Sequence, residues 1–269
     1  MTGPSLRRIR FLVIDIDGVL WHGRQPLPGV PAFFEFMNQH GIRFVIATNN
    51  SARPASDIVD RMARLGAPVN ASQVLTSAEA TAMYLPRLVP RGGRVFLVGG
   101  EGIASALTQA GYQLVDRDAD VVVAGIDFAL TYDKLKRAAL EIRRGSKFVG
   151  TNADKTFPSD EGLIPGAGSI LAALQAATDV VPIVVGKPES AMFDLALEKM
   201  GADRRAAAML GDRLDTDIEG AQKAGLASIL VLTGVTSRQA LVESSVRPDF
   251  VSEDLVALRV AWQAELQTR

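Results

Sequence analysis

Short apolar runs alternate with longer amphipathic segments along almost the whole chain. After a first run that begins at Phe11, runs rich in β-branched residues and bounded by Gly, Asp or Asn occupy residues 43–48, 94–99, 120–125, 147–151, 182–186, 207–212 and 227–232. Several of the segments between them have helical spacing, at residues 55–65, 102–110, 131–144, 168–177, 189–200 and 216–224. This alternation predicts an α/β fold in which parallel sheets are covered by helices.

Polar residues follow the ends of four of these runs. The first run is followed by Asp15, Asp17 and then Gly18. Two carboxylates would be costly inside a strand that is buried on both faces, so we expect them at its carboxyl end, where open α/β sheets bind ligands. Residues i and i+2 of a strand point to the same side, so both acids can address one site. For this segment alone, an Asp-rich turn is the simpler alternative.

Two further run ends carry groups suited to phosphate. Thr48, Asn49, Asn50 and Ser51 offer hydroxyl, amide and backbone N–H donors, although a helix N-cap would explain the same residues. Lys187 follows the run at 182–186 and is one of only seven lysines, against 22 arginines. Its position suggests a fixed positive charge, and a solvated loop lysine is the alternative.

The fourth polar run end supplies more carboxylates. Asp212 ends the run at 207–212, and Asp215 and Asp217 follow it. We interpret Asp215 as the cap of a helix that begins near Thr216. Carboxylates from two strand ends form the hard oxygen site that Mg²⁺ prefers. Together with the donors and the lysine, they predict phosphoryl transfer, in which aspartate can act as a nucleophile.

Composition narrows the alternatives. The chain has 269 residues, a formal net charge of −1, two histidines and no cysteine. Disulfides, Cys-based zinc sites and thiol nucleophiles are therefore excluded, and nothing in the charge favours nucleic acid or an anionic membrane. No apolar run reaches the roughly 18 residues of a membrane span. The basic N-terminal segment is not a signal peptide, because Asp15 and Asp17 interrupt the apolar run behind it, and we expect a cytoplasmic protein.

The four motifs, in this order, resemble those of the haloacid dehalogenase (HAD) superfamily of phosphatases. The matching pieces are DIDGV, ATNNS, GKP and GDRLDTD. The resemblance implies that Asp15 is the nucleophile and Asp17 the general acid/base, with Thr48, Asn49, Asn50 and Lys187 on the substrate phosphate. It also implies that Asp15, the backbone carbonyl of Asp17, and Asp212 bind Mg²⁺, with Asp217 orienting a metal-bound water.

The spacing of the motifs predicts an inserted domain. Residues 1–79 and 182–269 would form a Rossmann-like parallel-sheet core, and residues 80–181 a smaller α/β cap. This insertion resembles the C2-type cap of subfamily IIA, which includes nitrophenylphosphatase-like, phosphoglycolate and pyridoxal phosphate phosphatases. The implied partner is a small phosphorylated metabolite, and a homodimer through the cap is a further candidate. The candidates to face the substrate are Asp127, Asn152, Asp154 and Lys155. Helix caps and turns explain Asn152 and Asp154 at least as well.

Two other functions fit parts of the sequence. The segment VFLVGGEGIASAL (95–107) resembles a dinucleotide fingerprint, but Ser105 stands where the third glycine belongs. A non-catalytic module, either an aspartate-phosphorylated receiver or an interaction domain, would also combine acids, Mg²⁺ and a lysine. The order of the motifs and the long insertion favour a Mg²⁺-dependent phosphatase of small phosphomonoesters, whose substrate the sequence does not identify.

Overall fold

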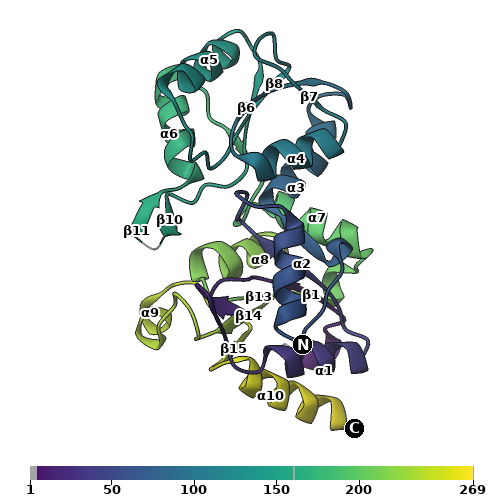
Figure 1. The fold of residues 1–269 in the computed structure, drawn as a ribbon. Helices are drawn as coiled ribbons and strands as arrows, with labels where there is room; N and C mark the ends of the chain where they lie inside the picture. The colour runs from purple at the N-terminus through teal and green to yellow at the C-terminus, as the bar shows by residue number, and fades with distance from the viewer. Residues whose placement is uncertain (1–4, 160, 269) are drawn as a thin grey trace. The chain divides into compact units, whose positions relative to one another are not determined.

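The computed structural model describes residues 5–159 and 161–268, which form two compact units (Figure 1). The first unit comprises the described residues up to Ala47, Ser56–Leu75, and those from Pro188 onward. The second comprises Thr48–Ala55 and Thr76–Lys187. Among the described residues, no helix combines the length and the apolarity needed to cross a bilayer.

The first unit is built on a six-stranded sheet in the order β15-β14-β13-β1-β4-β5. Its strands are β1 (Phe11–Ile14), β4 (Arg43–Thr48), β5 (Val74–Thr76), β13 (Ala207–Gly211), β14 (Ala227–Val231) and β15 (Phe250–Ser252). The pairs from β15 to β4 run parallel, with Ile14 level with Leu210 of β13 and Ile46 of β4. Because β1 is buried on both faces, its sequence FLVI is apolar throughout.

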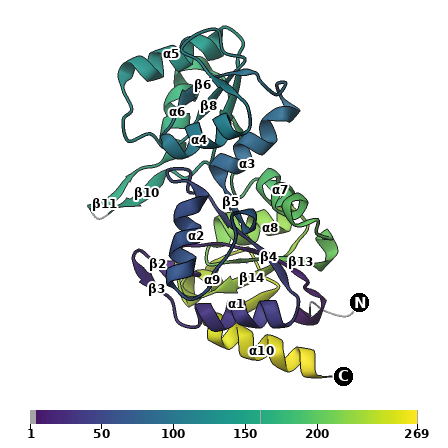
Figure 2. The same ribbon diagram turned by 45° about the vertical axis from the view of Figure 1, so that its right-hand side comes forward.

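Helices and a small hairpin complete the first unit. The helices are α1 (Val30–Gln39), α2 (Ala55–Arg64), α7 (Ser190–Met200), α8 (Glu219–Lys223), α9 (Arg238–Glu243) and α10 (Leu255–Gln267). Shorter elements are the 3-10 turns η1 (Leu6–Arg8), η2 (Ala71–Gln73) and η4 (Arg204–Ala206), and a π-helical turn η5 (Leu214–Ile218). The antiparallel hairpin consists of β2 (Trp21–His22) and β3 (Gln25–Pro26). Helices α1 and α10 lie side by side (Figure 2), and Trp262 of α10 is fully buried against Phe33 and Phe36 of α1.

The second unit has a parallel sheet of its own, in the order β12-β9-β8-β6-β7. Its strands are β6 (Arg94–Val98), β7 (Gln113–Leu114), β8 (Val121–Ala124), β9 (Lys147–Gly150) and β12 (Ile183–Val184). An antiparallel hairpin is formed by β10 (Thr156–Ser159) and β11 (Gly162–Pro165). Its helical elements are α3 (Ser77–Tyr84), η3 (Leu85–Arg87), α4 (Glu101–Gln109), α5 (Tyr132–Arg143) and α6 (Ala167–Thr178).

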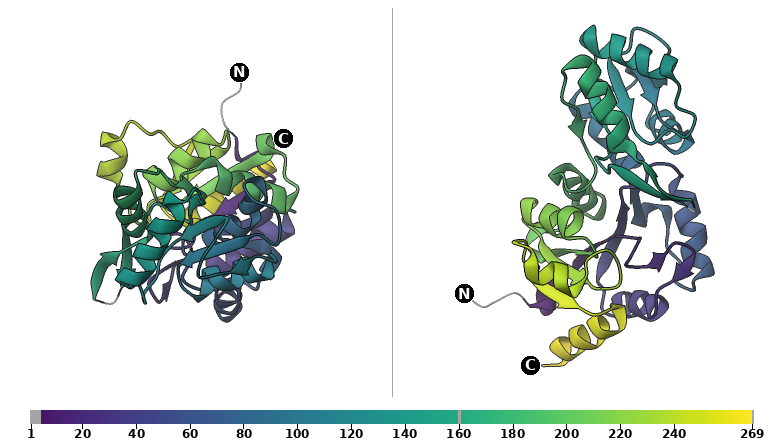
Figure 3. Two further views of the ribbon diagram at one scale, coloured as in Figure 1. Left: turned by 90° about the horizontal axis from the view of Figure 1, so that it is seen from above. Right: turned by 90° about the vertical axis from the view of Figure 1, so that its left-hand side faces the viewer.

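The core of the second unit follows from strand alternation. Phe96, Val122 and Phe148 lie on three neighbouring strands and form one buried cluster with Ile142 of α5 and Leu171 of α6. Figures 1 and 3 show the helices and strands of this unit as the teal-to-green part of the ribbon. Each helix therefore buries one apolar stripe on the apolar face of the sheet, as the alternating pattern predicted.

The predicted fold class, α/β with parallel sheets, is confirmed. The strand expected at 182–186 is only two residues long, and the helix expected at 216–224 begins instead with the π-helical turn at Leu214–Ile218. Residues 80–181 as a separate cap stay a prediction, because two compact units do not by themselves show which segment was inserted.

Candidate active site

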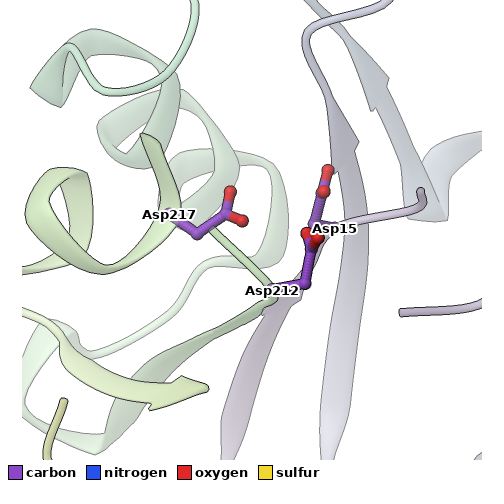
Figure 4. A group of neighbouring side chains, drawn as sticks. All are labelled: Asp15, Asp212 and Asp217. Atoms are coloured by element: carbon purple, nitrogen blue, oxygen red, sulfur yellow. The ribbon is translucent and has the colours of Figure 1, made fainter. Parts of the chain in front are cut away.

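Three aspartates gather at the carboxyl ends of two neighbouring strands. Asp15 directly follows β1, Asp212 directly follows β13, and Asp217 lies in the turn η5 (Figure 4). One carboxylate oxygen of each lies within 4.8 Å of the others. The exposed fractions are 8%, 1% and 0%, so these carboxylates are close together and almost shielded from water. Such crowding of like charges favours a bound cation.

Asp212 is held by a loop that the sequence analysis did not assign to the site. The backbone N–H of Val235 donates to Asp212 Oδ2 at 2.7 Å. Gly18 and Gly234 both lie against the same carboxylate, because a Cβ added to them would stand 2.4 Å and 1.9 Å from Oδ2. Gly18 also has a φ of 81°, a conformation that favours glycine. The loop therefore fixes Asp212 by close backbone approach, and in the loop sequence only Gly234 could have hinted at it.

Asp217 and Asp215 have different surroundings although they are two residues apart. Asp217 Oδ2 accepts a hydrogen bond from the backbone N–H of Arg213 at 3.1 Å, and a Cβ on Gly211 would meet its carboxylate at 2.3 Å. Asp215 was interpreted as the cap of a helix that begins near Thr216, but the turn η5 begins at Leu214, so Asp215 lies inside it. Its carboxylate accepts two bonds from the Arg213 guanidinium, at 3.1 and 2.8 Å, which lowers the pKa of Asp215.

Asp17 lies in the tight turn that follows Asp15. Its side chain is exposed, whereas the neighbouring Gly18 and Val19 are buried. The N–H of Gly18 donates to the carbonyl of Trp21 at 2.8 Å, and Thr233 Oγ1 donates to the carbonyl of Gly18 at 2.5 Å. The predicted nucleophile and the predicted acid/base thus differ in exposure, and the carboxylate cluster is made by Asp15, Asp212 and Asp217.

In the second unit, the predicted phosphate-binding residues form a connected group. The Asn49 side chain accepts from the N–H of Lys187 at 2.8 Å and donates to its carbonyl at 2.9 Å, which joins segments 138 positions apart. Thr48 and Lys187 are 4% and 3% exposed. Thr48 Oγ1 accepts from the Asn50 N–H at 3.1 Å, and Asn50 Oδ1 accepts from the Ala52 N–H at 2.9 Å. The structure brings Asn49 and Lys187 together, and the Asn49 amide is already used for that contact.

The predicted substrate-facing residues of the second unit take part in internal contacts. Asn152 is buried and donates to the Asn49 carbonyl at 2.8 Å, while its Oδ1 accepts from the Asp154 N–H at 3.1 Å. Asp127 pairs with Lys134 at 2.8 Å and accepts from the Ala129 N–H at 2.9 Å. The bonds from the Asp154 and Ala129 N–H groups are typical of turns, whereas the bond from Asn152 to Asn49 joins segments 103 positions apart.

The dinucleotide alternative does not fit the start of α4. A Cβ on Gly102 would stand 2.6 Å from the carbonyl oxygen of Ser51 and 3.0 Å from the backbone N of Arg53. The chain at 51–53 is therefore packed directly on the glycine-rich turn, where a pyrophosphate would have to approach. The small residue at position 102 is explained by this packing.

Comparisons with known proteins agree with the motifs. A family model described as haloacid dehalogenase-like hydrolase matches residues 12–113, and one described as HAD-hydrolase-like matches residues 184–258. An acid sugar phosphatase of Staphylococcus saprophyticus is 36% identical over 251 residues, which cover 93% of this chain and 96% of that protein.

Solved structures give the same result. A 4-nitrophenylphosphatase from Thermotoga maritima has a TM-score of 0.91 and 37% identity, covering 96% of this chain and 99% of that one. A glycerol phosphate phosphatase from Mycobacterium tuberculosis, in complex with magnesium, has a TM-score of 0.86 and 38% identity, covering 96% and 78%. The predicted resemblance is confirmed: the chain belongs to the haloacid dehalogenase-like hydrolase family and is a phosphatase of that family.

Proposed function

We propose that this protein is a Mg²⁺-dependent phosphatase that hydrolyses small phosphomonoesters through an aspartyl-phosphate intermediate. The observation that supports it best is the buried cluster of Asp15, Asp212 and Asp217. The cluster offers carboxylate oxygens as ligands, and the close backbone of Gly18 and Gly234 holds Asp212 in place. This donor set fits Mg²⁺, with Asp15, the Asp17 carbonyl and Asp212 as direct ligands and Asp217 orienting a bound water. When bound, Mg²⁺ would neutralise charge between a carboxylate and a phosphate dianion.

Asp15 and Asp17 have different tasks in the proposed reaction. A carboxylate oxygen of Asp15 forms a bond to phosphorus as the bond to the leaving oxygen breaks, and Asp17 supplies a proton to that oxygen. Asp17 then takes a proton from the water that attacks phosphorus, which releases inorganic phosphate and restores Asp15. The exposure of Asp17 suits this exchange of protons, while the burial of Asp15 suits a nucleophile kept from bulk water.

Phosphate recognition is assigned to the ATNNS and GKP motifs. Buried Lys187 supplies a fixed positive charge, and Thr48, Asn49 and Asn50 supply donors to the equatorial oxygens. Since the Asn49 side chain is engaged with the Lys187 backbone, we expect its backbone N–H rather than its amide to contact phosphate. Asn49 would then also set the position of Lys187.

The leaving group is expected to be small. The named relatives act on sugar phosphates, glycerol phosphate and 4-nitrophenyl phosphate, and the protein would share that broad class. We further propose that residues 1–79 and 182–269 carry the chemistry, whereas residues 80–181 select the leaving group.

One assay tests the proposal against a non-catalytic switch. Purified protein is incubated with p-nitrophenyl phosphate after EDTA treatment, and then with Mg²⁺ or Ca²⁺ restored. We expect turnover only with Mg²⁺, and inhibition by excess Ca²⁺, because its larger coordination shell misplaces the nucleophile. Full activity without metal, or phosphorylation of the protein without turnover, would refute the proposal. A phosphate-release screen of sugar phosphates, glycerol phosphate, phosphoglycolate, pyridoxal phosphate and nucleotides then identifies the substrate.

A further inference from the structure

The β2–β3 hairpin is the chain segment that directly follows the turn at Asp17 and Gly18. Trp21 of β2 forms a backbone bridge with Asp17, and its carbonyl accepts the Gly18 N–H at 2.8 Å. The hairpin is otherwise exposed from His22 to Pro26, and Trp21, at 5% exposed, is its buried anchor. The geometry of the Asp17 turn therefore depends on where Trp21 is held.

Arg61 of α2 holds this hairpin from outside. Its guanidinium carbon lies 3.9 Å from the centre of the Trp21 ring, well within the distance of a cation–π contact. The same guanidinium donates from Nη2 to the Gly23 carbonyl at 2.7 Å. The planar guanidinium of Arg61 thus covers the Trp21 ring and also binds the Gly23 carbonyl in the hairpin turn. A lysine side chain cannot make both contacts.

Arg61 also interacts electrostatically with Asp17, the proposed acid/base. Burial lowers the pKa of Arg61, the carboxylate of Asp17 raises it, and the nearby positive charge of Arg64 lowers it. The guanidinium of Arg61, which stays charged in proteins, is partly buried and within electrostatic reach of Asp17. On the other side of the turn, Thr233 Oγ1 bonds the Gly18 carbonyl, so the turn is held from both sides.

We propose that Arg61 is a positioning residue, which clamps the β2–β3 hairpin through Trp21 and Gly23 and thereby sets the placement of Asp17 for proton transfer. This inference rests on the proposed function, because it concerns the acid/base of that reaction. It predicts that loosening the clamp harms the protonation of the leaving oxygen more than it harms phosphate binding.

The test uses the full-length variants Arg61→Ala and Arg61→Lys, with Arg64→Ala as the matched control. Arg64 is exposed in the last turn of the same helix, so its loss removes the same charge from α2. The first measurement is acrylamide quenching of tryptophan fluorescence. The chain has two tryptophans, and Trp262 is fully buried, so a change reports on Trp21. We expect quenching to rise about two-fold in Arg61→Ala, less in Arg61→Lys, and not in Arg64→Ala.

The second measurement is kcat/KM with Mg²⁺ for p-nitrophenyl phosphate and for the best aliphatic phosphate of the screen. Nitrophenolate leaves without a proton, whereas an alkoxide needs one, so Arg61→Ala should lose about ten-fold more activity on the aliphatic substrate. Unchanged quenching would overturn the clamp, and equal losses on both substrates would overturn the positioning of Asp17. Absence of wild-type turnover would refute the proposed function and, with it, the proposed effect of Arg61 on proton transfer by Asp17. The quenching measurement would still show whether Arg61 holds the hairpin through Trp21.

Discussion

Gly234→Ala is the substitution that most sharply tests how Asp212 is positioned. A Cβ at this position would stand 1.9 Å from Asp212 Oδ2, whereas real Cβ contacts essentially never fall below 3.0 Å. The difference, 3.0 minus 1.9, means that the carboxylate or the loop must move by at least 1.1 Å. The Val235 N–H bond to the same oxygen, 2.7 Å long, lies in the path of that movement.

The size of the effect follows from this displacement. A misplacement of about 1 Å near a reacting centre can cost on the order of 10² in rate, and losing a hydrogen bond to a charged group costs about 1.5–3 kcal/mol. We therefore expect kcat/KM of Gly234→Ala to fall about 100-fold at fixed Mg²⁺, with part of the loss recovered at higher Mg²⁺. The assay is a Mg²⁺ titration of p-nitrophenyl phosphate hydrolysis, with the Mg²⁺-induced change in Tm as a second readout.

Gly100→Ala provides the control. Its Cβ would come no closer than 3.7 Å to the Ile126 carbonyl oxygen, and its backbone, with φ at −84°, accepts alanine. We expect its kcat/KM to stay within about two-fold of the wild type. If Gly234→Ala retained more than half of the activity and an unchanged Mg²⁺ titration, close packing of the loop would not be what positions Asp212.

Three further results are expected. Asp17→Asn should lose ~10²–10⁴-fold in kcat/KM on aliphatic phosphates and less on p-nitrophenyl phosphate, and equal losses would contradict its role as an acid. Asp217→Asn should weaken Mg²⁺ activation about ten-fold or more, whereas Asp215→Asn, which weakens an exposed pair with Arg213, should leave it nearly unchanged; equal effects in a Mg²⁺ titration would contradict the cluster. Replacing residues 80–181 with a Gly/Ser linker should leave Mg²⁺-dependent Tm stabilisation but reduce discrimination among substrates, and an unchanged ratio of kcat/KM values in a folded variant would contradict the division of roles.

The sequence predicted the parts of the site that lie at strand ends. Asp15 and Asp212 each follow an apolar run, and parallel pairing of β1 with β13 necessarily brings such run ends to one edge of the sheet. Their proximity follows from periodicity and topology alone. The order of the motifs then sufficed to identify the family before any contact was known.

Other contacts could not be predicted because they join segments far apart in the chain. Gly234 and Val235 carry no chemical group that attracts notice, and their role depends on a loop approaching Asp212 from a different strand. The bond between Asn49 and Lys187 spans 138 positions, so the amide was read only as a donor to phosphate. The π-helical turn escaped prediction for a different, local reason: helical spacing from 216 to 224 does not show that the Arg213 N–H reaches Asp217.

The central claim is that Asp15 carries the phosphoryl group during turnover. The most direct measurement is acid quenching of the Mg²⁺-loaded enzyme during steady-state hydrolysis, followed by borohydride reduction and mass spectrometry of the peptide that contains Asp15 and Asp17. Reduction of an acyl phosphate converts the modified aspartate to homoserine. The account predicts homoserine at position 15, in the presence of substrate and Mg²⁺ only. Homoserine at another aspartate, or none at all in an enzyme that is turning over, would contradict it.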